Sequence, residues 1–192
     1  MRIFLLFAVV FFIACAPVKE DAPKQLKGDP FELKAQGIQY LVENNPERAI
    51  PYLYTASLHW PDDAELLGAL GEAMLRTGRN EQGIGFLKRA TEVSPYDLNS
   101  RLALGNAYKI LGYYDDAVKQ YSSIIDTRPD NLMALGSLGD TYYKSGNNAE
   151  CVKHFAHFME VVEKKAARLS ERDKRFYELA KKQHAECKAA MK

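Results

Sequence analysis

Large and small apolar residues recur along this chain at the spacing of α-helices. Leu104 and Tyr108 are four residues apart, and Ala117, Tyr121 and Ile124 follow at steps of four and three. Such steps place side chains on one face of a helix. The pattern therefore predicts two amphipathic helices separated by a short connection.

The same pattern returns every 34 residues, which indicates an internal repeat. Three prolines keep this spacing: Pro61, Pro95 and Pro129. Residues suited to helix N-caps keep it as well: Asp29, Asp63, Asp97 and Asn131. So do residues that tolerate the left-handed conformation at a helix end: Asn44, Gly78, Gly112 and Gly146. Each unit therefore predicts a helix of about fourteen residues, a tight turn and a second helix.

These residues resemble the tetratricopeptide repeat. The third unit matches its consensus at Arg101, Leu104, Gly105, Tyr108, Ala117, Tyr121, Ile124 and Pro129. Small residues such as Gly105 and Ala117 let two antiparallel helices approach closely, while large ones fill the space between neighbouring pairs. The resemblance implies an all-α, right-handed superhelical solenoid of four helix-turn-helix repeats, at residues 30–63, 64–97, 98–131 and 132–169.

The fourth repeat departs from the pattern at its end, because Glu163 replaces the proline. We expect its second helix to run on by seven residues, or two turns. Ser170 and Asp173 then have the spacing of a capping box. Residues 170–192 should form a solitary capping helix, from Glu171 to Ala190, that covers the last hydrophobic face of the solenoid.

The N-terminus has the features of an export signal. An apolar run from Ile3 to Ala14 is too short to cross a bilayer and ends at Cys15. The segment resembles a bacterial lipobox, which implies cleavage after residue 14 and acylation of Cys15. The alternative is an ordinary cleaved signal peptide with an incidental cysteine. Residues 15–29 read as a flexible tether with a reach of about 20 Å, and Ala16 after the cysteine favours an outer-membrane anchor facing the periplasm.

The resemblance also places the binding surface on the concave face, which the first helix of each repeat lines. We assign this groove to Ile38, Leu41, Val42, Glu72, Leu75, Arg76, Leu102, Asn106, Lys109, Ile110, Asp140 and Tyr143. The apolar members would hold a helix or an extended segment of a partner, with Asn106, Lys109 and Asp140 fixing its register. Gly68 and Gly136 on the same face fit either a close ligand backbone or tight helix packing.

Cys151 and Cys187 are the remaining cysteines once Cys15 is acylated. Export would place them in an oxidising compartment. In a hairpin that turns near Leu169 the two residues lie at the same height on neighbouring helices. Two readings remain open, a disulfide bond and two separate buried thiols.

Cys151, His154 and His157 could imitate a metal site, with Glu150 and Glu160 on the same helix. We expect a solvated helix face instead, because residues on one exposed helix give no closed ligand shell. The sequence contains no GxSxG, HExxH, P-loop or dinucleotide glycine pattern. We therefore expect no catalytic residues, no metal and no cofactor.

Charge excludes one class of partner. Without residues 1–14, which hold Arg2 and no acid, 25 Lys and Arg balance 25 Asp and Glu. A neutral chain without a basic block has no electrostatic footprint for nucleic acid. The chain resembles the repeat-containing lipoproteins that help assemble type IV pilus secretins, which implies a protein-binding scaffold in an envelope machine. A recruiter of peptidoglycan enzymes is the alternative.

Overall fold

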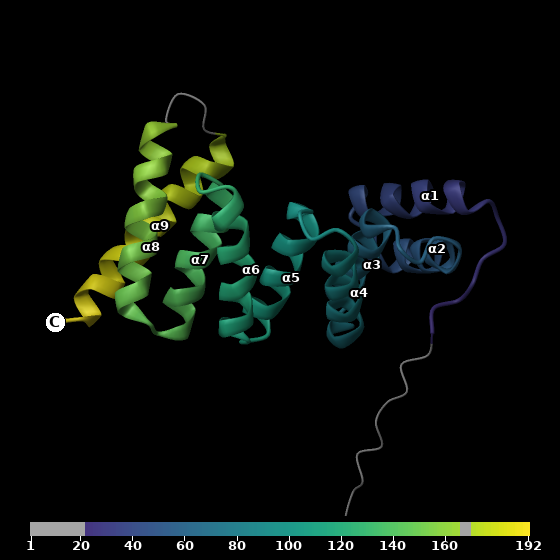
Figure 1. Cartoon of the computed structure of the whole chain (residues 1–192), viewed down its shortest axis with the longest axis horizontal. Helices are drawn as coiled ribbons and strands as arrows, with labels where there is room; N and C mark the ends of the chain where they lie inside the picture. The colour runs from purple at the N-terminus through teal and green to yellow at the C-terminus, as the bar shows by residue number, and fades with distance from the viewer. Residues whose placement is uncertain (1–21, 166–169) are drawn as a thin grey trace, which may run out of the picture.

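The computed structural model describes residues 22–165 and 170–192, and these residues form nine α-helices and no strand. The helices are α1 (Pro30–Val42), α2 (Pro46–His59), α3 (Ala64–Arg76), α4 (Asn80–Val93), α5 (Leu98–Ile110), α6 (Tyr114–Thr127), α7 (Leu132–Ser145), α8 (Asn148–Lys164) and α9 (Glu171–Ala190). Figure 1 shows the pairs stacked in chain order from α1–α2 to α7–α8, with α9 against α8. The predicted all-α solenoid is confirmed.

The predicted caps begin and end the helices. Asp29 accepts hydrogen bonds from the backbone N–H groups of Phe31 and Glu32, and the other N-cap residues act in the same way: Asp63, Asp97 and Asn131. The predicted left-handed residues all have positive φ, with values of 59° at Asn44, 82° at Gly78 and Gly112, and 75° at Gly146. The N-cap residues and the left-handed residues therefore fix where the first helix of each repeat begins and ends.

Close contact between the two helices of a repeat depends on a missing side chain. A Cβ atom on Gly105 of α5 would lie 2.7 Å from Cε1 of Tyr121 on α6, which is closer than packed carbon atoms come. The equivalent pairs in the other repeats are equally tight: Gly37 with Leu53, Gly71 with Leu87, and Gly139 with Phe155. The phenolic hydroxyl of Tyr121 donates to Oδ1 of Asn106 at 2.7 Å, so this buried ring keeps its polar atom bonded.

The apolar core runs as three successive clusters rather than one centre. The first joins repeats one and two around Leu53 and Leu70, and the second joins repeats two to four around Tyr121. The third joins α7, α8 and α9 around Phe155 and Phe158. Each repeat therefore depends on its neighbours for burial, as expected of a solenoid.

The last helices follow the prediction in part. The capping box of Ser170 and Asp173 is present, and α9 spans Glu171 to Ala190 as expected. The extension of α8 is shorter than predicted, because this helix has 17 residues against 14 in α2, α4 and α6 and ends at Lys164. Residues 166–169, which the predicted extension would include, lie outside the described residues.

The end of the expected tether is attached to the first repeat. The backbone N–H of Leu26 donates to Oγ1 of Thr55 on α2 at 2.9 Å. The Leu26 side chain is half-buried and packs against the first core cluster. The sequence predicts a flexible segment here because it is polar, is interrupted by Pro17 and Pro23 and has no apolar period. Leu26 nevertheless covers apolar surface of the first core cluster. Cys15 and residues 15–21 lie outside the described residues.

Candidate protein-binding groove

The concave face of the solenoid carries a continuous groove made of four adjoining hollows. The first lies over α1 and the α2–α3 connection, and it shares Glu65 with the second. The second shares Glu72, Asn99 and Ala103 with the third, which lies over α3, α5 and α7. The third shares Leu102, Asn106 and Met133 with the fourth, which reaches α9. One long ligand could therefore contact all repeats.

The first hollow combines exposed aromatic surface with a half-buried cation. Phe31 is 71% exposed and lies at its rim with Ile38. Nζ of Lys34 lies 2.7 Å from carboxylate oxygens of both Asp63 and Glu65. Burial alone would lower the pKa of Lys34, but the two carboxylates outweigh it and raise that pKa above its ordinary value.

Asp63 connects this ion pair to the fold. Its Oδ1 atom accepts the backbone N–H of Leu66 and so caps α3, while its Oδ2 atom accepts from Lys34. Burial would raise the pKa of the Asp63 carboxyl, but these bonds outweigh it and hold that pKa below its usual value. Lys34 therefore links the first helix of repeat one to the first helix of repeat two.

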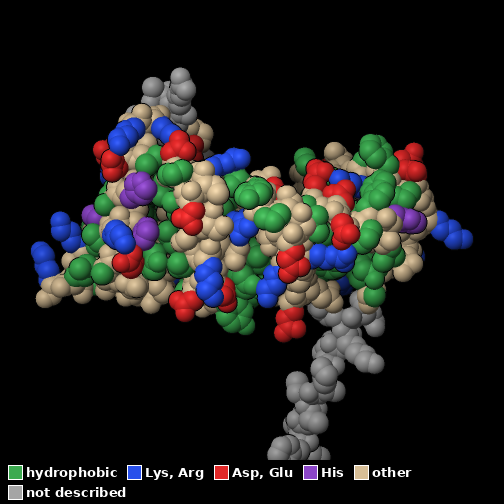
Figure 2. Space-filling view, in the orientation of Figure 1, with side chains coloured by type: hydrophobic (Ala, Val, Ile, Leu, Met, Phe, Trp, Pro, Cys, Tyr) green, Lys and Arg blue, Asp and Glu red, His purple; other side chains and the backbone are tan. Residues whose placement is uncertain are grey.

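The middle of the groove is apolar and open. Ile110 at the end of α5 is 80% exposed, and Met133 at the start of α7 is 53% exposed. Leu102 is only 8% exposed and forms the floor between them, together with the half-buried Leu75. Figure 2 shows hydrophobic side chains reaching the surface over α1 and α5 on one face, with charged side chains among them.

Helix α9 closes the groove at its far end. Phe176 lies against Gly136 of α7, where a Cβ atom would overlap its ring, and stacks edge-on against Phe158 with ring centroids 5.4 Å apart. The last hollow, about 500 Å³, lies between α5, α7 and the first half of α9. Phe176, Leu179, Asp173 and Arg175 line it from α9. The prediction missed these four residues, although their position on the capping helix could have indicated them.

Eight predicted groove residues line this surface: Ile38, Glu72, Leu75, Arg76, Leu102, Asn106, Lys109 and Ile110. Val42 is 75% exposed at the end of α1, and Leu41 packs against the first core cluster. The expected open position of Asp140 and Tyr143 differs from the structure, because α9 engages both. Tyr143 donates to Glu186 at 2.7 Å, and Asp140 accepts from Gln183 at 3.2 Å and from Lys109 at 2.8 Å.

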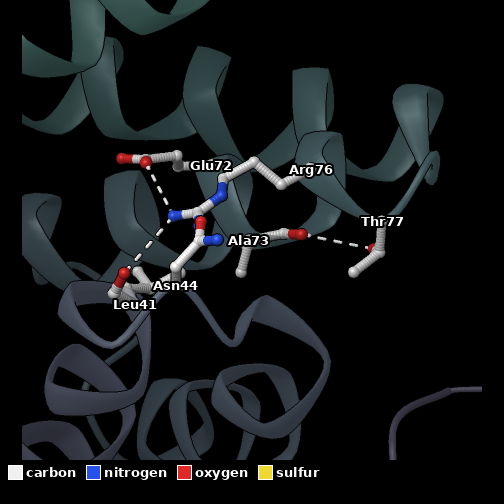
Figure 3. Close-up of polar contacts among 6 residues, drawn as sticks. All are labelled: Leu41, Asn44, Glu72, Ala73, Arg76 and Thr77. Carbon is white, nitrogen blue, oxygen red and sulfur yellow. Dashed lines mark hydrogen bonds and ion pairs between the residues drawn. The ribbon is translucent and has the colours of Figure 1, made fainter.

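Arg76 has an internal role that the prediction did not include (Figure 3). Its guanidinium donates to the backbone oxygen of Leu41 and to Oε1 of Glu72, both at 3.4 Å, and to Oδ1 of Asn44. It therefore holds the left-handed turn after α1 against α3.

The two concave-face glycines pack against the next helix along the concave face, α5 for Gly68 and α9 for Gly136. A Cβ atom on Gly68 would lie 2.8 Å from Oγ of Ser100 on α5, and Gly136 lies under Phe176. At Gly136 the structure matches tight helix packing, whereas Gly68 is half-buried and lines the second hollow, so both interpretations still fit Gly68. Gly136 is buried, so no ligand backbone reaches it in this arrangement.

Cys151 and Cys187 are bonded to each other in the structure and join α8 to α9 with Cα atoms 6.3 Å apart. Both residues are buried, with exposures of 0% and 1%. Cys151 occupies the small position that packs within repeat four, and its side chain still reaches α9. The bond therefore fixes the capping helix beside the last repeat.

The histidines of α8 do not converge on a shared centre. His154 stacks on Tyr142 with ring centroids 5.0 Å apart and contacts Oε2 of Glu150 at 3.1 Å. Burial lowers the pKa of His154, and this effect outweighs the negative charge of Glu150, which acts to raise that pKa. His157 is exposed, and the Cys151 sulfur belongs to the disulfide. Residues 22–165 and 170–192 contain no cluster of three or more His, Cys, Asp or Glu side chains placed to hold a metal ion.

Within the same described residues, no helix is both long enough and apolar enough to cross a bilayer.

Comparisons with known proteins agree with this architecture. Two sequence models described as tetratricopeptide repeat match residues 40–108 and 102–150, which together span more than half of the chain. No curated protein matches the chain significantly in sequence.

Solved structures share the fold. A crystal structure of MamA protein is 28% identical with a TM-score of 0.69, over 74% of this chain and 78% of that one. MamA from Desulfovibrio magneticus RS-1, from its residue 41 to its end, is 15% identical with a TM-score of 0.65, over 85% and 96%. A tetratricopeptide repeat protein from Parabacteroides merdae ATCC 43184 is 20% identical with a TM-score of 0.66, over 82% and 60%. The chain belongs to the tetratricopeptide repeat family, which consists of protein-interaction scaffolds.

Proposed function

We propose that this protein is a lipid-anchored scaffold of the bacterial cell envelope that binds a segment of a partner protein in its concave groove and has no catalytic role. The observation that carries the proposal is the exposure of Ile110 and Met133 inside the groove, at 80% and 53%. Large apolar side chains gathered in a concavity favour a ligand that removes them from water. The groove crosses every repeat, so its ligand should be an elongated segment, either an extended peptide or a helix.

Anchoring at Cys15 follows from the export segment and the lipobox resemblance. An outer-membrane position facing the periplasm is the proposed location. The bond between Cys151 and Cys187 supports an oxidising compartment. Leu26, docked on Thr55, leaves residues 15–25 as the longest stretch that can separate the domain from the lipid surface.

The proposed partner is a component of an envelope assembly such as type IV pilus or secretion machinery. Recruitment of peptidoglycan enzymes is the second candidate, and it uses the same groove and the same anchor. The identity of the captured protein distinguishes the two.

Affinity capture from detergent-solubilised envelopes of the native host tests the proposal. Met133→Asp and Ile110→Asp each place a charge on exposed groove surface, and Met133 lies in the first turn of α7, where an acidic residue suits the helix. Both variants should lose the captured partner. Tyr96→Asp is the matched control, because Tyr96 is 83% exposed beside α6, outside the groove. Equal capture by all four proteins would contradict groove binding.

A further inference from the structure

Exposed charge is unequal along the groove, and its first half presents carboxylates. The side chains of Glu65 and Glu72 are 71% and 53% exposed. The cations that pair with them are more deeply placed, at 17% for Lys34 and 29% for Arg76. Lys34 is shared between Glu65 and Asp63, so one cation faces two acids. A ligand over α1 and α3 therefore meets negative charge.

The far end of the groove presents one exposed cation, Arg175. Lys109 and Arg175 both line the last hollow. Arg175 is exposed, and in the part of the chain that the structure describes no carboxylate pairs with it. The side chain of Lys109 is only 15% exposed and pairs with Asp140 at 2.8 Å, so it adds little positive charge to the surface of this hollow. The one acid of the lining, Asp173, accepts from the backbone N–H and hydroxyl of Ser170 and is occupied in capping α9.

The surface between these ends is uncharged. Beyond Glu72 and Arg76, the middle hollow is lined only by neutral side chains, among them Leu102, Ile110 and Met133. An acidic end, an apolar middle and a basic end therefore follow one another from α1 to α9.

We infer that the groove selects a bipolar segment of its partner, with basic residues over α1 and α3, apolar residues over α5 and α7, and a carboxylate over Arg175. The inference rests on the proposed groove binding and adds the chemistry of the guest. Complementary charge at both ends orients such a segment and excludes segments with one sign of charge throughout.

The spacing of the charges follows from the stacking. Neighbouring helices lie about 8–10 Å apart, so α3 and α9 are separated by roughly 25–30 Å across α5 and α7. An extended chain covers this distance with about eight residues, and a helix does so with about twenty.

Synthetic fluorescent peptides test the inference by anisotropy with the full-length protein. Each carries a central stretch of leucine and serine, of either eight or twenty residues, between two charged ends. The ends are lysine and glutamate, lysine and lysine, or glutamate and glutamate. The mixed peptide should bind at least about tenfold more tightly than either uniform peptide at low salt.

Arg175→Glu makes both ends of the groove acidic and should make the lysine–lysine peptide the tightest. Lys188→Glu is the matched control, because Lys188 is exposed on the same helix but lies outside the groove lining. An unchanged ranking in Arg175→Glu would overturn the inference, as would equal binding of all three peptides. If all three peptides bind the unchanged protein equally and Met133→Asp abolishes this binding, the groove is the binding site and only the inferred charge preference is wrong. If no peptide binds while a native partner is captured, the inferred charge preference is wrong and the proposed groove binding still holds.

Discussion

Phe176 of α9 occupies the space above Gly136 of α7 that a side chain would need. Around this contact the capping helix covers part of the concave face of repeat four, while Met133 at the start of α7 stays 53% exposed. The open part of the groove therefore runs over the first three repeats and the start of α7, and it ends at α9. Binding and capping use neighbouring parts of one surface.

Gly136→Ala should destabilise the protein by about 1–2 kcal/mol. The added methyl group overlaps the Phe176 ring, and overpacking of this kind costs more than the gain in helix propensity. Urea unfolding measures the difference. Gly85→Ala is the control, since a Cβ atom there meets nothing within 4 Å, and it should raise stability by up to about 1 kcal/mol. Equal stability of Gly136→Ala and the unchanged protein would contradict the packing account.

Reduction of the disulfide between Cys151 and Cys187 should lower stability by about 4 kcal/mol, because the bond closes a loop with a sequence separation of 36. Thermal unfolding with and without a reductant measures the loss. A variant with alanine at both positions should melt at the same temperature in both conditions. Two titratable thiols in unfolded, unreduced protein purified from envelopes would show that the bond does not form there.

Asp63→Asn should make the free energy of unfolding fall less steeply as the pH is lowered from 7 to 2. The pKa of the Asp63 carboxyl is lowered in the folded protein from 3.8, so its stabilising effect is present above about pH 4 and is lost as pH falls through the folded-state pKa. Asparagine keeps the cap on Leu66 without the charge. Free energies of unfolding from pH 2 to 7 measure the change. A wild-type profile that falls no more steeply than that of the variant would rule out this ion pair as a source of acid sensitivity.

Cys15→Ser should release the protein from membranes. Without the thiol no lipid can be attached, and a cleaved export signal alone leaves no anchor. Fractionation and mass spectrometry of the N-terminal peptide measure the change, with Cys187→Ser as a control that should remain membrane-bound. Recovery of Cys15→Ser in the membrane fraction would mean that something other than acylation holds the protein there.

The fold was predictable because its determinants are local and repeated. Asp97 begins a helix, Gly112 ends one, and Gly105 lets Tyr121 approach, all within one 34-residue unit. The same 34-residue spacing predicts which residues of each first helix lie on the concave face. Most of the predicted groove residues therefore line the hollows.

The differences from the prediction depend on contacts between distant parts of the chain. Arg76 bonds to the turn at Asn44, and Asp140 and Tyr143 contact Gln183 and Glu186 of α9. These partners are 32 to 43 residues away, so no helical periodicity indicates them. The packing of helices that are distant in the sequence therefore decides which polar side chains stay available to a ligand.

Hydrogen–deuterium exchange of the full-length protein with and without its captured partner tests the central claim most directly. Binding inside the curve should slow exchange in α1, α3, α5 and the first half of α7, which line the open groove, and leave the outer helices α4 and α6 unchanged. Slower exchange confined to α4 and α6, with α1, α3 and α5 unchanged, would show that the partner binds the convex side and would contradict the account.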